Sequence, residues 1–110
     1  MLHVLRKPAT DQQIKEMLEV YESYIKIAVD VRRELLAGGG EFYADCEAAL
    51  LDDGSRREDV WGADWISADT TIRYAALINI RSRVNPAMGI QDPPTRRQVE
   101  AIIRKLFQRS

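Results

Sequence analysis

Acidic side chains alternate with apolar ones along the middle of the chain, which is the spacing that gathers side chains on one face of a β-strand. Several carboxylates on one face can hold a divalent cation, or act as general acid and general base, while a nearby arginine binds an anion. The candidate binding residues of this face are Asp30, Glu34, Asp45, Glu47, Trp61, Asp64, Asn79 and Arg81. A metal-assisted reaction would use Asp30, Asp45, Glu47 and Asp64, with Arg81 on the anion. No catalytic role is assigned to any one of them.

Two simpler interpretations of the same residues stay open. The face is either a solvated surface with cross-strand ion pairs, each worth roughly 0.2–1 kcal/mol, or an interface. Arg32 and Arg81 fall among the acids, so the repulsion between carboxylates is already neutralised without a metal ion. Ala75 and Leu77 fall on the same face and give it the apolar share that an interface needs. We therefore predict no bound metal.

The string from Trp61 to Trp65 is the most unusual short sequence in the chain. One interpretation is a pair of core tryptophans with Gly62 making room between strands. The other exposes an aromatic pair beside Asp64, which is typical of a binding surface.

Cys46 and His3 are the chain's one cysteine and one histidine. Cys46 lies between two alanines of an alternating run, so we expect a small buried core residue rather than a nucleophile paired with His3. The glycines at 38–40 lack the Lys-Ser/Thr partner of a phosphate-binding loop, and we expect a flexible hairpin connection there.

Apolar periodicity locates the elements that position these residues. A capping pair at Thr10 and Gln13 opens a helix, and Thr95 is the expected cap of a second, with Val99, Ile102 and Ile103 on its apolar face. Between them the period changes to two. Strands are expected at 2–5, 25–31, 42–50, 60–66 and 72–81. In these strands Phe42, Cys46, Ile78 and Ile80 should point inward.

Short connections between successive strands favour an antiparallel meander of four to five strands. Two amphipathic helices can cover only one face of such a sheet. The predicted fold is α+β, in the order β-α-β-β-β-β-α, with both helices on one face and the other face open. The candidate residues lie on that open face.

Length and composition set further bounds. The 110 residues fit a single domain, residues 1–110, and the formal net charge of -1 argues against a polyanion binder driven by bulk charge. Residues 41–69 carry nine acids against two arginines, whereas residues 95–110 carry five basic residues against one acid. No apolar run approaches the roughly 20 residues that span a bilayer, and no signal peptide is visible, so we expect a cytoplasmic protein. One histidine and one cysteine argue against zinc and haem, and we expect no cofactor.

Several strings together carry a resemblance that covers nearly the whole chain: 36–41 (Leu-Ala-Gly-Gly-Gly-Glu), 44–47 (Ala-Asp-Cys-Glu), 51–55 (Leu-Asp-Asp-Gly-Ser), 61–65 (Trp-Gly-Ala-Asp-Trp) and 76–81 (Ala-Leu-Ile-Asn-Ile-Arg). They resemble a family of small bacterial and cyanobacterial proteins, domain of unknown function 5674. The resemblance implies a stand-alone bacterial protein. It implies no activity and no site residues.

Two functions remain as hypotheses. The favoured one is a non-catalytic interaction module that uses the open, charged sheet face to bind a second copy or a small protein partner, with no role for nucleic acid or membrane. The other is a metal-assisted hydrolase or nuclease-like enzyme, for which the carboxyl groups of Asp30, Asp45 and Asp64 must converge in a pocket. A toxin–antitoxin component is a variant that rests on size and architecture alone.

Overall fold

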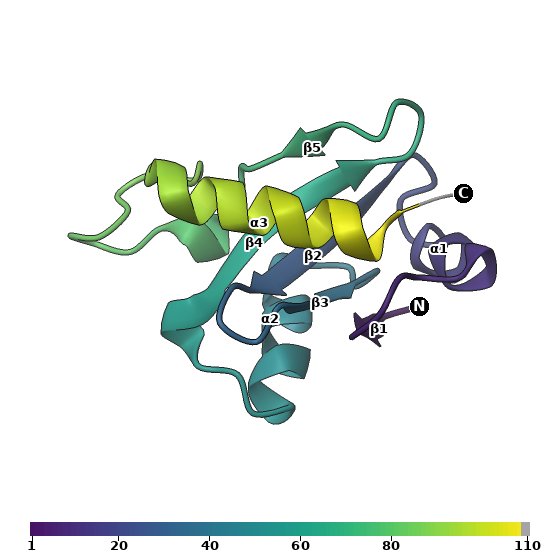
Figure 1. Cartoon of the computed structure of the whole chain (residues 1–110), viewed down its shortest axis with the longest axis horizontal. Helices are drawn as coiled ribbons and strands as arrows, with labels where there is room; N and C mark the ends of the chain where they lie inside the picture. Colours follow the sequence, from purple (N-terminus) through teal and green to yellow (C-terminus); the bar gives the residue numbers. More distant parts are fainter. Residues whose placement is uncertain (109–110) are drawn as a thin grey trace.

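The computed structural model describes residues 1–108. Within them, five strands form one sheet, flanked by three α-helices and two short 3₁₀ helices, η1 and η2 (Figure 1). The elements are β1 (His3–Leu5), α1 (Asp11–Met17), β2 (Tyr24–Asp30), β3 (Leu35–Gly38), α2 (Tyr43–Asp52), η1 (Arg57–Asp59), β4 (Val60–Ile66), β5 (Ile72–Arg73), η2 (Leu77–Asn79) and α3 (Pro93–Leu106).

The strands are arranged in the order β1-β3-β2-β4-β5, and every neighbouring pair is antiparallel. The predicted α+β class and antiparallel sheet are confirmed. The sheet is not a simple meander, however. Because β2 is antiparallel to both of its neighbours, β3 and β4 run parallel to each other, and α2 connects them across β2.

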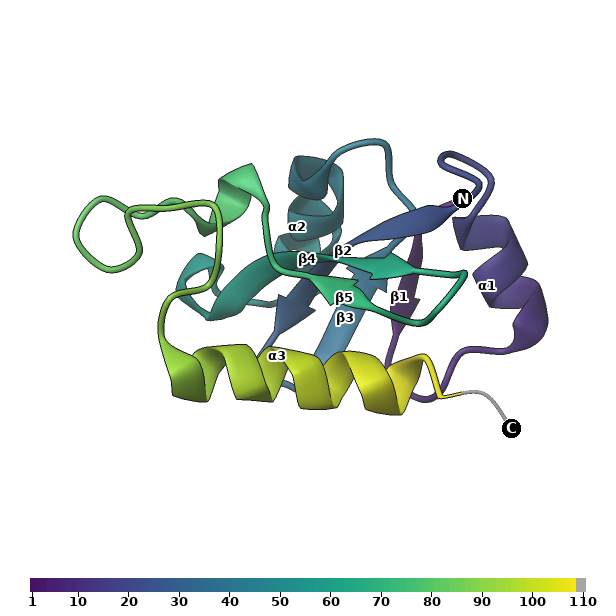
Figure 2. The ribbon, with the colours of Figure 1, turned by 90° about the horizontal axis from the view of Figure 1, so that it is seen from above.

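Helices cover both faces of the sheet. The two predicted helices, α1 and α3, share one cluster with Ile25, Ile27 and Trp65, so they do lie on one face. The opposite face packs against α2 through Cys46 and Leu50 (Figure 2). The expectation of an open face was wrong, because the helix that covers it had been assigned to the sheet.

That helix replaces the strand expected at 42–50. Its alanines and leucines are strong helix formers, and Cys46 and Leu50 are four residues apart, on one side of a helix. The carboxylate of Asp45 accepts a hydrogen bond from the backbone N–H of Phe42 and stabilises the first turn. Cys46 is buried as expected, but Phe42 is 59% exposed instead of pointing inward.

The strand expected at 72–81 is also wrong, since only Ile72 and Arg73 pair with β4. The chain then turns into η2, and this reverses the expected burial. Asn79 is fully buried, Ile78 is half-buried and Ile80 is 49% exposed. A side-chain amide therefore occupies the position beside β4 that a strand would otherwise take.

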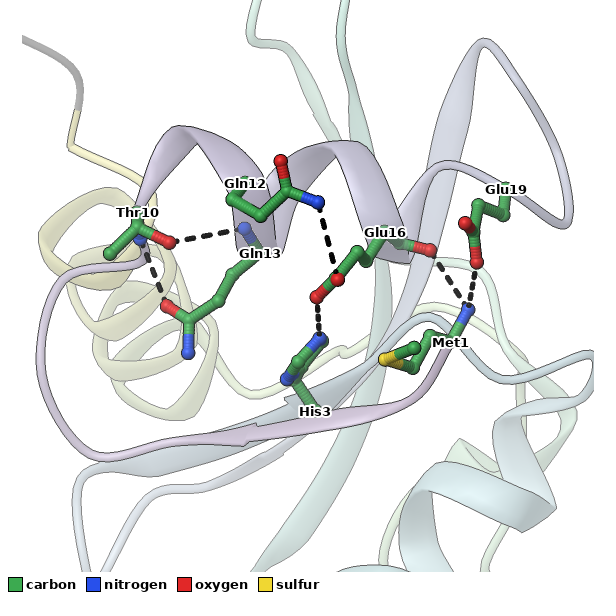
Figure 3. A network of polar contacts seen from close by, with 7 residues as sticks. All are labelled: Met1, His3, Thr10, Gln12, Gln13, Glu16 and Glu19. Atoms are coloured by element: carbon green, nitrogen blue, oxygen red, sulfur yellow. Dashed lines mark hydrogen bonds and ion pairs between the residues drawn. The ribbon is translucent and has the colours of Figure 1, made fainter.

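The first helix begins as expected. The hydroxyl of Thr10 accepts a hydrogen bond from the N–H of Gln13, and the Gln13 side chain accepts one from the N–H of Thr10 (Figure 3). The second expected cap was one turn off. Asp92 caps α3, and both the N–H and the hydroxyl of Thr95 donate to its carboxylate. A carboxylate competes better than a hydroxyl for these donors.

The three glycines at 38–40 do not form a hairpin connection, because they lead from β3 into α2. Gly39 has a φ of +93°, and a Cβ there would lie 2.3 Å from the carbonyl oxygen of Met1. The glycines therefore allow the N-terminal residues and Met17 to pack against the end of β3.

Candidate functional site

The first predicted acid, Asp30, is fully buried at the end of β2. Its Oδ1 accepts hydrogen bonds from the N–H groups of Arg32 and Arg33, both at 2.9 Å, and so builds the turn into β3. Its Oδ2 is buried without a hydrogen-bond partner among residues 1–108. Glu34 completes this turn with a φ of +56°.

Asp45 and Asp64 also have separate local partners. Asp45 caps α2, while Asp64 accepts a 2.5 Å hydrogen bond from the hydroxyl of Tyr43 and lies 3.4 Å from the guanidinium of Arg73. No group of three or more His, Cys, Asp or Glu residues within residues 1–108 is placed to hold a metal ion. The acid convergence that a metal-assisted hydrolase requires does not occur at these residues.

Trp61 and Arg81 form a stacked pair at the other end of β4. The guanidinium carbon lies 3.9 Å from the centre of the indole ring, and Arg81 donates to the carbonyl oxygens of Glu58 and Val60. Burial lowers the pKa of Arg81 from its usual value. Both tryptophans are buried, so the core interpretation of the Trp61–Trp65 string is confirmed.

Glu47 lies 4.0 Å from Arg57 at the surface of α2.

Two buried asparagines hold the segment of residues 77–88. The side chain of Asn79 accepts from the N–H of Gly62 and donates to three carbonyl oxygens, including that of Met88. Asn85 donates to the carbonyl oxygens of Asn79, Ala87 and Gly89, and it accepts from the N–H of Gln91. The 77–88 segment is therefore fixed by internal hydrogen bonds, although it protrudes from the body of the molecule (Figure 2).

This protruding segment carries most of the large apolar side chains that residues 1–108 leave exposed. Leu77 is 69% exposed, Ile80 49%, Val84 76% and Met88 47%. The exposed parts of these apolar side chains make no contact that stabilises the free molecule. They are typical of a contact surface.

A pocket of about 290 Å³ lies where the 77–88 segment meets the start of α2, and its lining is mostly apolar. Lys26 of β2 is the one charged group among its lining residues, which are Lys26, Phe42, Tyr43, Ala44, Leu77 and Ile78. The ammonium lies 4.8 Å from the ring centre of Tyr21, 4.9 Å from that of Tyr43 and 5.7 Å from that of Phe42. Three aromatic faces thus surround one cation.

A buried polar network adjoins this pocket. Lys26 and Asp64 are cross-strand partners, and Arg73 of β5 is the partner of Asp64 on its other side. Burial raises the pKa of Asp64, although the hydrogen bond from Tyr43 and the charges of Arg73 and Lys26 oppose this effect. Burial and the hydrogen bond to Asp64 together raise the pKa of Tyr43, so its hydroxyl acts as a donor and not as a base.

The sequence patterns pointed to Asp64 but not to Lys26, Phe42 and Tyr43 as parts of a site. A strand at 42–50 would have turned Tyr43 away from Phe42, whereas a helix brings both rings beside Lys26. The available signal was the concentration of aromatic residues at 21, 24, 42 and 43, near a lysine within a predicted strand.

A family described as "Protein of unknown function (DUF5674)" matches residues 3–106. The chain belongs to the DUF5674 family. No curated protein and no solved structure matches this DUF5674 chain. Within residues 1–108 no helix combines the length and the apolar character that a bilayer crossing requires.

Proposed function

We propose that this DUF5674 protein is a non-catalytic interaction module that binds a second copy of itself through the 77–88 segment. The observation that carries the proposal is the exposure of Leu77, Ile80, Val84 and Met88 on a segment held by Asn79 and Asn85. A surface that is rigid before binding loses little conformational entropy when it docks.

Charge supports a second copy as the partner. The 77–88 segment carries two arginines and no acid, and the side chain of Arg83 is exposed, with no hydrogen bond or ion pair to any residue in 1–108. Residues 41–69, which include α2, carry nine acids against two arginines. Most of these acids have local partners, but Glu41 and Asp52, near the two ends of α2, are exposed and make no ion pair with a residue in 1–108. The segment of one copy is therefore complementary to the α2 side of another, and reciprocal contacts of this kind close a two-fold dimer.

Two further features fit the proposal. The acids that an enzyme hypothesis would need are used locally in turns, caps and ion pairs. The one cysteine is buried and free, which suits the reducing cytoplasm that we propose as the compartment.

Analytical ultracentrifugation over the micromolar range tests the proposal. We expect the wild type to form dimers, and we expect Leu77→Glu and Val84→Glu to sediment as monomers because each places a charge in the apolar contact. Ala101→Glu is the matched control, since it adds the same charge to the exposed side of α3 and should leave the dimer unchanged. A wild-type monomer at the highest soluble concentration would contradict the proposal, as would dimers that survive both substitutions.

A further inference from the structure

The pocket beside Lys26 has a shape and polarity that the proposed dimer contact does not explain. It is partly enclosed, has a volume of about 290 Å³ and is lined by two ring systems, two aliphatic side chains, Ala44 and one ammonium. Ligand pockets generally begin at roughly 300 Å³, so this one has room for a single small molecule. An apolar pocket with one cation selects a ligand that is itself apolar with one negative charge.

Within residues 1–108 the ammonium of Lys26 has no hydrogen-bond acceptor. Its three ring neighbours lie at 4.8–5.7 Å and stabilise its charge, but ring faces do not replace the oxygen acceptors of three N–H donors. No side-chain or backbone oxygen of residues 1–108 makes a hydrogen bond or ion pair with this nitrogen. Asp64, its cross-strand partner, is instead bonded to Tyr43 and paired with Arg73.

The local charge balance also favours an anionic ligand. Lys26 and Arg73 contribute two positive charges around the single carboxylate of Asp64, so the cluster has room for one more negative charge. Within the pocket only one ammonium is available, without the arginine fork that recognises a phosphate. A monoanion therefore fits better than a phosphate dianion.

We propose that this pocket binds a small free monocarboxylate with an aromatic or branched aliphatic tail. The carboxylate accepts hydrogen bonds from the ammonium of Lys26, and the tail packs between Phe42 and Leu77 against Ile78. Binding is reversible and involves no covalent step. Leu77 belongs both to the pocket and to the proposed dimer contact, whereas Val84 lies outside the pocket lining. A substitution at Val84 therefore tests the dimer contact without altering the pocket.

An NMR titration with 3-phenylpropionate tests the site, with 3-phenylpropionamide as a neutral probe of the same shape. We expect saturable shifts of the amide signals of Tyr43, Ala44, Leu77 and Ile78, and an affinity at least about tenfold higher for the acid than for the amide, because a hydrogen-bonded charge is lost in the amide. Equal affinity for the two probes, or no saturable shift with the acid, would overturn the inference.

Variants define the contribution of each group. Lys26→Met keeps the length of the side chain and should weaken binding of the acid about tenfold. Lys15→Met, at an exposed position of α1, is the control and should leave the affinity for the acid unchanged. Ala44→Leu fills the mouth of the pocket from an exposed position and should abolish binding without touching the core. Should Lys26→Met not fold, an Ala44→Leu variant that folds and still binds the acid as the wild type does would contradict the proposal.

Two further arms of the titration distinguish this site from the dimer contact and from a site for a peptide end. Val84→Glu should bind 3-phenylpropionate as the wild type does, whether or not it dissociates the dimer, so failure of the proposed function leaves this result intact.

N-acetylphenylalanine adds the amide of a polypeptide end to the same carboxylate. If it bound much more tightly than 3-phenylpropionate, the natural occupant would be a chain terminus, and the assignment to a free small molecule would be wrong.

Discussion

The side-chain amide of Asn79 pairs with both backbone groups of Gly62. Its Oδ1 accepts from the N–H of Gly62 at 2.7 Å, and its Nδ2 donates to the Gly62 carbonyl oxygen at 2.9 Å. One buried side chain therefore continues the hydrogen bonding of β4 beyond the short strand β5. The same nitrogen also reaches the carbonyl oxygens of Tyr74 and Met88, which joins the 77–88 segment to the sheet.

Substitution of Asn79 tests this connection. Asn79→Ala leaves buried N–H and C=O groups unsatisfied and should lower the free energy of unfolding by about 3 kcal/mol. Urea denaturation provides the measurement. Gln98→Ala on the exposed side of α3 is the control, and it should change stability little. Equal midpoints for the two variants would mean that the amide does not hold the segment.

Position 62 must be glycine because neighbouring side chains pack closely against its Cα. A Cβ at this position would lie 2.6 Å from the Cβ of Ala76 and 2.9 Å from Cγ1 of Ile78. Gly62→Ala should therefore destabilise the protein by roughly 1–3 kcal/mol in thermal or urea melts. Gly89→Ala is the matched control, because a Cβ there meets nothing within 4 Å. A Gly62→Ala variant as stable as Gly89→Ala would show that η2 moves away without cost.

Cys46 should be chemically inert in the folded protein. Burial raises the pKa of its thiol to about 11, and the side chain packs between α2 and the sheet with no exposed surface. We expect negligible reaction with Ellman's reagent at pH 8, and rapid reaction once urea unfolds the chain. A variant that combines Cys46→Ala with Ala101→Cys should react at once. Fast labelling of the folded wild type would indicate frequent opening between α2 and the sheet.

Asp53 and Asp64 should change the pH dependence of the free energy of unfolding in opposite directions. Hydrogen bonds from Arg33 and Arg6 lower the pKa of Asp53, so this carboxylate contributes stability above its ordinary pKa of 3.8 that is lost as the pH falls through the folded pKa. Burial raises the pKa of Asp64, so the folded state holds its proton at higher pH than the unfolded chain does. This contribution to stability is largest at low pH and is lost as the pH rises from 3.8 through the folded pKa.

Urea titrations between pH 3 and pH 7 measure this pair. Asp53→Asn should make stability less sensitive to acid than in the wild type, and Asp64→Asn should make it more sensitive. Parallel stability profiles for the two variants would contradict the opposite signs of the two pKa shifts.

Periodicity was sufficient where the large apolar side chains of an element lie on one side, even though Ala28 and Asp30 on the other side of β2 are buried as well. The alternation from Ile25 to Val31 predicted β2, and the stripe of Val99, Ile102 and Ile103 predicted α3. It failed at 42–50, because Cys46 and Leu50 satisfy both a period of two and a spacing of four. Alanine, which occupies positions 48 and 49 between them, fits either face.

The candidate site was harder to predict than the fold, since it depends on those same misassigned segments. Lys26 acquires the rings of Phe42 and Tyr43 as neighbours only when residues 43–52 form a helix. Asn79 becomes buried only when the chain turns at Ala76. Side chains that replace strand pairing, as Asn79 does, leave no periodic pattern in a sequence. Asp30, Asp45 and Asp64 each have a separate local partner, which spacing alone does not reveal.

The central position of β2 has a consequence for how the chain folds. β2 is hydrogen-bonded to β3, its near neighbour in the sequence, and to β4, which follows only after α2. The hairpin of β2 and β3 can form early, but its second edge stays uncovered until the crossover delivers β4. In pulsed hydrogen exchange, we expect the amides between β2 and β3 to become protected before those between β2 and β4.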